Sequence, residues 1–314
     1  MKILLNLELN DHQVGQIRAV SHKVELIRPG SPAEALAAMP GVEVVFGDFS
    51  REMFQRAARL RWVQTVGAGV DGILSPEFVE SAVILTSGKG TVGVHLAEHA
   101  LALLLGLTRG IAQAVRHPRW EKRMQIRHAS WELIDRTLGI IGLGGTGLEL
   151  AARAHGFGMR VIAVDPEPVE KPDCVEACWG MDRFHDLLAA ADVVAICAPL
   201  TPQTEGMFDR EAFRRMQPHA LLINVTRGRI VEEGALLEAL EKGLIGGAGL
   251  DVTPQEPLPA DHPLWRMENV IVTPHTAGGS PNRQDRITRL FCENLGRFLR
   301  GDPLLSVIDK RKGY

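Results

Sequence analysis

Residues 138–147 read LGIIGLGGTG, a short apolar run that leads into three glycines in the pattern GxGxxG. The following stretch, 148–155, has a helical pattern, and a second apolar run occupies 160–164. A strand, a glycine-rich turn and a helix in this order predict a βαβ unit that binds the pyrophosphate of a dinucleotide. Because the chain has 32 glycines, the motif alone would be weak evidence, and the elements around it carry the prediction.

Each glycine of the motif has its own expected role. Gly142 permits the tight turn, Gly144 lets the backbone approach a pyrophosphate, and Gly147 allows the helix to pack closely on the strand. Asp165 ends the next strand, where an acidic residue is expected to accept hydrogen bonds from ribose hydroxyls. Its carboxylate would repel the 2′-phosphate of NADP, and residues 166–168 offer no arginine. NAD is therefore the predicted cofactor.

The alternation of strand-like and helix-like segments continues along the chain. Apolar runs occupy 138–142, 160–164, 193–197, 221–225, 247–252 and 270–273, with a weaker run at 175–179. Helical patterns fill 147–155, 184–190 and 233–242. Such alternation predicts a doubly wound, mostly parallel sheet with helices on both faces, in a Rossmann-type dinucleotide-binding domain over 96–280.

The first ninety residues show the same alternation in a weaker form. Strand-like runs occur at 42–46, 62–66 and 83–86, and residues 1–9 suit a first strand better than a signal peptide. We expect a second, smaller α/β domain from residues 1–95, to which the chain returns with a last helix at 283–300. An apolar helix over 96–107 would link the two domains. The second domain would therefore comprise 1–95 and 281–314.

Composition limits the classes of partner. The 314 residues suit two domains, and 45% hydrophobic with 23% charged residues is an ordinary globular composition. A net charge of −3 without a basic block argues against nucleic acid, and no run reaches the 18 apolar residues of a membrane span. The four cysteines lack a metal-type CxxC pair, and we expect reduced thiols in a cytoplasmic protein.

Three chemically active side chains follow three of the apolar runs. Arg227, Glu256 and His275 each lie just beyond a predicted strand, and the carboxyl ends of parallel strands share one edge of a sheet. An imidazole titrates near neutrality and suits a proton donor to a carbonyl oxygen, and an adjacent carboxylate would stabilise the imidazolium. The planar guanidinium of an arginine can bind a carboxylate with two hydrogen bonds. Each residue alone would be read as an ordinary loop residue, but together they predict reduction of a keto acid.

At these residues the chain resembles the D-isomer-specific 2-hydroxyacid dehydrogenase family. The matching stretches are GLGGTG at 142–147, INVTRGRIVEEGAL at 223–236, GLDVTPQEPLPADHPLW at 249–265 and NVIVTPHTAG at 269–278. The resemblance extends from about Thr65 to Gly278 and includes the tail at 307–310, while the first sixty residues carry no signature of the family. It implies an NAD-dependent oxidoreductase that interconverts a small 2-keto acid and its D-2-hydroxy acid, with a flavodoxin-like substrate domain.

The resemblance also implies roles for individual residues. The catalytic set is Arg227, Glu256 and His275. The implied cofactor contacts are Gly142, Gly144, Gly145, Thr146, Gly147, Asp165, Ala198, Pro199, Thr204, Thr226 and Asp251, with Asp251 at the nicotinamide amide. Besides Arg227, the substrate carboxylate would meet the backbone loop of Val66, Gly67, Ala68 and Gly69. A homodimer through the cofactor domain is implied. Residues 116–131 would form the arm for that contact, and the alternative is an arm that packs within a monomer.

Three other interpretations fit parts of the sequence. Residues 95–99 read HLAEH and match the HxxEH zinc motif, but their surroundings predict an apolar helix rather than an open metal site. Formate dehydrogenases resemble this pattern but carry glutamine where this chain has Glu256. A non-catalytic, NAD-sensing scaffold on the same fold could keep all three catalytic residues, although the chain lacks long polar tails.

Overall fold

The computed structural model describes all 314 residues, which divide into two compact units. The small unit comprises Met1–Val92 and Ser280–Tyr314, and the large unit comprises Gly93–Gly279. These divisions lie within three residues of those that the sequence predicts. No helix combines the length and the apolar character that crossing a membrane requires. All four cysteines are free thiols.

The large unit is built on a seven-stranded sheet in which every pair of neighbours is parallel. The strand order is β12-β11-β10-β9-β6-β7-β8. The strands are β6 (Thr137–Ile141), β7 (Arg160–Val164), β8 (Ala177–Trp179), β9 (Val193–Ile196), β10 (Leu221–Asn224), β11 (Gly247–Leu250) and β12 (Val270–Val272). The predicted doubly wound parallel sheet is confirmed, and the weaker run at 175–179 forms its edge strand β8.

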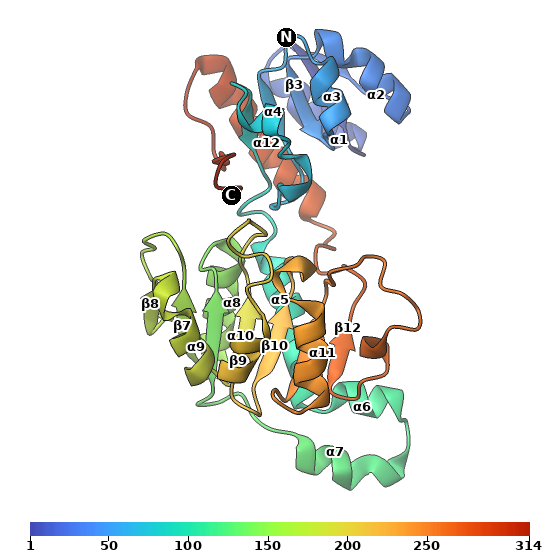
Figure 1. Ribbon diagram of the computed structural model, residues 1–314. Coiled ribbons are helices and arrows are strands. Elements are labelled where there is room, and N and C mark those ends of the chain that lie inside the picture. The colour runs from blue at the N-terminus through green and yellow to red at the C-terminus, as the bar shows by residue number, and fades with distance from the viewer. The chain divides into compact units, whose positions relative to one another are not determined.

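Helices cover both faces of this sheet (Figure 1). The helices are α5 (Gly93–Thr108), α6 (Ile111–Arg116), α7 (Arg123–Ala129), α8 (Gly145–Gly156), α9 (Phe184–Ala190), α10 (Arg210–Arg215) and α11 (Glu233–Glu241). Helices α5 and α8 share one apolar core with alternate strand residues such as Leu138 and Ile140. Helices α9, α10 and α11 share the other core with residues such as Ile141. The strands are buried on both faces, which explains their continuous apolar runs.

Two glycines, one on the sheet and one on α5, let the helix approach the sheet closely. A Cβ added to Gly249 of β11 would lie 2.8 Å from the Cβ of Leu103, and one on Gly106 of α5 would lie 2.8 Å from Cδ1 of Ile271 in β12. A larger residue at Gly249 would require the helix or the strand to move, whereas one at Gly106 would displace the end of the Ile271 side chain. The 16-residue helix is therefore fixed against the strands that lead to the predicted catalytic residues.

The small unit has a five-stranded parallel sheet in the order β2-β1-β3-β4-β5, which is the flavodoxin-like order. Its strands are β1 (Lys2–Asn6), β2 (Glu25–Ile27), β3 (Val44–Gly47), β4 (Trp62–Gln64) and β5 (Ile84–Thr86). Its helices are α1 (Asp11–Val20), α2 (Pro32–Ala38), α3 (Arg51–Arg56), α4 (Pro76–Val79) and α12 (Arg283–Arg300). Helix α12 brings the chain back to this unit, where Phe291 stacks on Phe46 with ring centroids 4.1 Å apart.

Residues 116–131, which the sequence suggests as a dimer arm, contain the end of α6 and all of α7. Figure 1 shows these two helices extending past one end of the large-unit sheet. Trp120 is 84% exposed, and Val115 and Met124 are also exposed. Arg116 anchors the start of the segment by donating a 2.7 Å hydrogen bond to the carbonyl of Met267. The segment thus presents apolar side chains on the outside of the unit.

Candidate active site

The carboxyl ends of the large-unit strands bring the three predicted side chains to one edge of the sheet. Arg227 follows β10, Glu256 lies in the loop after β11, and His275 follows β12. These three strands are adjacent and parallel, so their ends meet at the same edge. The glycine loop after β6 opens at that edge as well.

His275 and Glu256 form a hydrogen-bonded pair. Nδ1 of His275 lies 2.8 Å from Oε2 of Glu256, while Oε1 of Glu256 accepts a 3.1 Å bond from the amide of Thr253. A carboxylate accepts hydrogen bonds and cannot donate them, so Nδ1 carries a proton and Nε2 is left for a ligand. The His275 side chain is 49% exposed and can therefore reach a bound molecule. The pair can deliver or accept one proton at Nε2.

The backbone that presents His275 is unusual for a residue with a side chain. His275 has a φ of 53°, in the left-handed region that non-glycine residues rarely adopt. Its amide donates to the carbonyl of Asp251 at 2.8 Å and to that of Thr273 at 3.0 Å. These bonds fix the turn from which the imidazole reaches Glu256.

Asp251, at the end of β11, holds the rest of this turn through its side chain. Its carboxylate accepts bonds from the amides of Thr276 and Ala277, both at 2.9 Å, and from the hydroxyl of Thr273 at 2.6 Å. Asp251 is only 1% exposed, so these donors replace water around a buried charge. Hereafter we call residues 273–277 the histidine turn.

The surroundings of Asp251 keep it ionised. Burial by itself raises the pKa of its carboxyl group. The hydrogen bonds that it accepts from the side chains of His99 and Thr273, and from two backbone amides, outweigh burial and lower the pKa to about 2. The prediction that Asp251 meets the nicotinamide amide stays a prediction. The structure gives this carboxylate a further set of partners, which the sequence does not indicate.

Arg227 is positioned by a buried asparagine. Asn224, only 1% exposed, donates from Nδ2 to the carbonyl of Arg227 at 2.9 Å and accepts from the amide of Thr226 at 3.1 Å. The guanidinium of Arg227 donates from Nη1 to the carbonyl of Thr226 at 2.9 Å. The last residue of β10 therefore fixes the backbone on which the predicted carboxylate-binding arginine stands.

The glycine loop has the geometry that a phosphate cradle requires. Gly142 has a φ of 91°, and a Cβ on it would lie 2.9 Å from the backbone of Ala198. A Cβ on Gly147 would lie 2.3 Å from the carbonyl oxygen of Gly142, so the helix packs closely on the strand. At Gly144, the N-cap of α8, a Cβ would meet nothing within 4 Å. That side of the loop is open, and the free amides of the helix N-terminus favour an anion there.

Two further residues that are predicted to contact the cofactor form hydrogen bonds within the loops at this edge. Asp165 accepts a 2.8 Å bond from the amide of Leu143 in the glycine loop and a 3.0 Å bond from the amide of Glu167. Thr204 donates its hydroxyl to the carbonyl of Pro199 at 2.7 Å. Each residue therefore has a structural function in its loop, alongside the cofactor contact that remains a prediction.

The predicted substrate loop, Val66–Val70, lies in the small unit at the carboxyl end of β4. The carbonyl of Gly67 accepts bonds from the hydroxyl of Thr65 at 3.1 Å and the amide of Gly88 at 2.8 Å. The amides of Gly67, Ala68 and Gly69 donate no backbone hydrogen bond. The loop is thus held through a carbonyl while three neighbouring amides can bind an anion.

One residue of this region is absent from the predicted set. His99, from the HxxEH sequence on α5, places Nε2 2.8 Å from the Thr273 hydroxyl and 3.3 Å from Oδ1 of Asp251. The HxxEH sequence drew attention to this residue, but it does not indicate the contacts with Thr273 and Asp251. His95 of the same motif is buried, 7% exposed, near the start of the helix.

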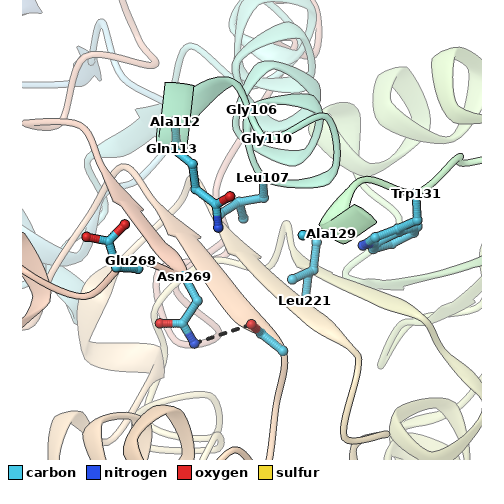
Figure 2. A pocket seen from close by; sticks show the side chains of 11 residues that line it. Gly106, Leu107, Gly110, Ala112, Gln113, Ala129, Trp131, Leu221, Glu268 and Asn269 are labelled. Carbon is cyan, nitrogen blue, oxygen red and sulfur yellow. Dashed lines mark hydrogen bonds between the residues drawn. The ribbon is translucent and has the colours of Figure 1, made fainter. Parts of the chain in front are cut away.

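A separate cavity of about 170 Å³ lies at the other end of the large-unit sheet (Figure 2). Leu221 begins β10, while Gly246 and Asn269 immediately precede β11 and β12, so these residues mark the amino ends of the strands. In Figure 2 the Asn269 side chain donates to the carbonyl of Gly246, a bond of 3.3 Å. This cavity is therefore distinct from the edge that carries the predicted catalytic residues.

Gly228 offers a test of how the Arg227 and Glu256 loops fit together. A Cβ on Gly228 would lie 1.9 Å from the backbone carbon of Thr253, so Gly228→Ala must force the two loops apart. We expect it to lower the free energy of unfolding by about 1–3 kcal/mol, measured by urea denaturation. In the control Gly234→Ala, on α11, the added methyl meets nothing within 4 Å. The control should leave stability unchanged or raise it by up to about 1 kcal/mol. Equal effects of the two substitutions would contradict this packing.

Comparison with known proteins identifies the family. The model of the family described as "D-isomer specific 2-hydroxyacid dehydrogenase, NAD binding domain" matches residues 101–277. A glyoxylate reductase of Korarchaeum cryptofilum is 36% identical over 83% of this chain and 80% of its own length. A D-3-phosphoglycerate dehydrogenase of Archaeoglobus fulgidus is 30% identical over 98% of this chain, which spans 59% of that longer protein.

The solved structures agree with the sequence matches. A D-isomer specific 2-hydroxyacid dehydrogenase family protein from Aeromonas salmonicida superimposes with a TM-score of 0.82 at 31% identity, over 98% of this chain and 99% of that one. Its likeness covers both units, whereas the family model covers most of the large unit. The chain belongs to the D-isomer-specific 2-hydroxyacid dehydrogenase family, and its large unit is an NAD-binding domain.

Proposed function

We propose that this protein interconverts a small 2-keto acid and the corresponding D-2-hydroxy acid. The observation that carries the proposal is the 2.8 Å contact between His275 and Glu256, at the sheet edge that also holds Arg227 and the glycine loop. When NAD is bound in its reduced form, it supplies a hydride to the carbonyl carbon. His275 supplies the proton to the carbonyl oxygen from Nε2, and in the reverse direction it accepts that proton.

The other residues bind and orient the substrate in this proposal. Arg227 binds the substrate carboxylate and polarises the carbonyl group through its guanidinium. The amides of Gly67, Ala68 and Gly69, which donate no backbone hydrogen bond, provide further donors for the carboxylate. Glu256 holds the imidazole through Nδ1 and stabilises the imidazolium. Binding, orientation and proton transfer thus fall to different groups.

The chain fits NAD at the edge described above. The open side of Gly144 at the N-terminus of α8 suits the pyrophosphate, and Asp165 at the end of β7 is placed to accept ribose hydroxyls. We infer a preference for NAD over NADP. Asp165 is already fixed by the amides of Leu143 and Glu167, so its charge cannot easily move away from a 2′-phosphate. The neighbouring Glu167 adds a second negative charge rather than an arginine.

The residues of the predicted substrate loop in the small unit favour one class of substrate. No arginine or lysine lies in the loop 66–70, so no cationic group within it is available for a phosphate. This favours glyoxylate, hydroxypyruvate or pyruvate over a phosphorylated acid. The relatives include enzymes of both kinds, a glyoxylate reductase and a D-3-phosphoglycerate dehydrogenase.

Formate oxidation is the competing chemistry on this fold. A formate dehydrogenase from Staphylococcus aureus, solved with NAD, superimposes with a TM-score of 0.76 at 29% identity. Formate oxidation transfers a hydride without a general acid, whereas His275, hydrogen-bonded to Glu256, is arranged to exchange a proton. The pair therefore favours a keto acid.

We also propose a homodimer formed through the large unit. Exposed apolar side chains at Ile111, Val115, Trp120 and Met124 lie on or beside α6 and α7 and are available for self-association. The four free cysteines are in keeping with a reducing, cytoplasmic location.

The function is tested by a turnover assay with the purified protein. NADH oxidation is followed with glyoxylate, hydroxypyruvate, pyruvate and longer 2-keto acids, and each is repeated with NADPH. We expect turnover with at least one short 2-keto acid and a higher kcat/KM with NADH. Formate-dependent NAD reduction would support the competing chemistry, and NADH binding without any turnover would support a sensing scaffold. Equal kcat/KM with NADH and NADPH would contradict the role given to Asp165.

Replacement of His275 tests the proton donor. In His275→Gln, NADH binding should stay near normal while kcat falls by about 10²–10⁴-fold, the usual contribution of a positioned acid–base group. The control is His219→Gln, because His219 also pairs with a carboxylate, that of Asp192, at 2.7 Å. His219 precedes β10 and so lies at the opposite edge of the sheet. Its replacement should leave kcat unchanged. Comparable losses in both variants would mean that His275 has no special role.

A further inference from the structure

We propose that His99 is a positioning residue for proton transfer, because it ties α5 to the histidine turn and so fixes His275 beside its partner Glu256. This inference rests on the proposed function of His275. It concerns a residue that touches neither substrate nor cofactor in the mechanism above. Its contacts all lie within the large unit.

The geometry connects His99 to the turn through two atoms. Nε2 of His99 lies 2.8 Å from Oγ1 of Thr273 and 3.3 Å from Oδ1 of Asp251. Thr273 is the first residue of the histidine turn, and Asp251 binds the amides of its last two residues, Thr276 and Ala277. His99 therefore contacts both the start of the turn and the carboxylate that holds its end.

The direction of each hydrogen bond follows from what the groups can donate. The Asp251 carboxylate is ionised and only accepts, so the Thr273 hydroxyl gives its proton to Oδ1 across 2.6 Å. The hydroxyl then has only lone pairs left for His99. Nε2 of His99 must carry a hydrogen, and it donates to Thr273 with Asp251 as a longer second acceptor. The function of His99 is thus to supply a fixed N–H.

Helix α5, which carries His99, is held against the sheet. Close contacts of Leu103 with Gly249 and of Gly106 with Ile271 hold α5 against the two strands that lead into the site. The His99 side chain is 22% exposed, so its N–H is largely removed from competing water. A donor on a fixed helix therefore restrains a turn whose own backbone is held in the left-handed conformation at His275.

A loss of this donor should loosen the turn without unfolding the unit. A shift of about 1 Å in a reacting group can cost about 10²-fold in rate. Because Arg227 follows a different strand, β10, and its backbone is held by Asn224, substrate binding should be little affected. The expected signature is a fall in kcat at nearly constant KM.

The first test measures amide hydrogen exchange by NMR and requires no turnover. In His99→Leu, the amides of Thr276 and Ala277 should exchange at least about tenfold faster, the effect of losing one bond to a charged group. In His99→Gln, the side-chain amide places an N–H near the position of Nε2, so their exchange should return close to the wild-type rate. The control Glu98→Gln alters the adjacent residue of α5, whose exposed side chain pairs with Arg153 of α8 and not with the histidine turn, and should leave the exchange of these two amides unchanged.

The second test measures steady-state kinetics with the best 2-keto acid. His99→Leu should lower kcat by about 10- to 100-fold and raise the solvent deuterium isotope effect on kcat, with KM almost unchanged. His99→Gln should restore both quantities. If His99→Leu does not fold, Thr273→Val removes the bridging hydroxyl at nearly constant volume and should give the same exchange and kinetic changes.

The two tests separate this inference from the proposed function. Absence of 2-keto acid turnover in the wild-type protein would overturn the proposed function, while the exchange experiment would still test the role of His99. Wild-type exchange at Thr276 and Ala277 in His99→Leu would overturn the inference. So would a His99→Gln variant as impaired as His99→Leu, because an N–H at that position would then be irrelevant.

Discussion

The arrangement of the site depends on one buried charge, the carboxylate of Asp251. It is 1% exposed, and it accepts hydrogen bonds from donors on α5 and on the histidine turn. A buried carboxylate without such partners would be strongly unfavourable, and here the donors hold its pKa near 2. The charge and the turn stabilise each other. The donors of the turn replace water around the carboxylate, and the carboxylate accepts hydrogen bonds from amides that would otherwise have no partner in the turn.

This interaction explains how a strained residue can be kept at the site. His275 has a left-handed backbone, which costs of the order of 1–3 kcal/mol for such a conformation. The bonds from the turn to the Asp251 carboxylate and carbonyl oppose that cost. The imidazole of His275 forms a hydrogen bond with Glu256, which lies in the loop after β11. Asp251 follows this same strand. One strand end thus supplies both the support of the turn and the partner of the ring.

Much of this could be predicted from sequence because it depends on local patterns. The run 138–147 identified the strand, the turn and the helix, and the apolar runs identified the strands that Arg227, Glu256 and His275 follow. Strand β2 and helix α1 were not predicted. Strand β2 has only three residues, none fully buried, and α1 buries only three of its ten, so neither has a strong apolar pattern. The full role of Asp251 could not be predicted, since the partners of its carboxylate come from two segments far from it in the sequence, α5 and the histidine turn.

An ionised Asp251 therefore stabilises the large unit and its histidine turn. This stabilisation is tested by urea unfolding of this unit in wild type and Asp251→Asn, followed by tryptophan fluorescence from pH 7 to pH 3. A folded-state pKa of about 2, below the ordinary 3.8, means stability that is present above pH 4–5 and is lost as pH falls toward 2. The free energy of unfolding of the wild-type protein should therefore exceed that of Asp251→Asn by an amount that includes about 2 kcal/mol at pH 7 from the ionised carboxylate. This contribution should drop to about half by pH 3. A difference in free energy of unfolding that stays constant from pH 7 to pH 3, or no difference at all, would show that the ionised carboxylate does not stabilise the unit.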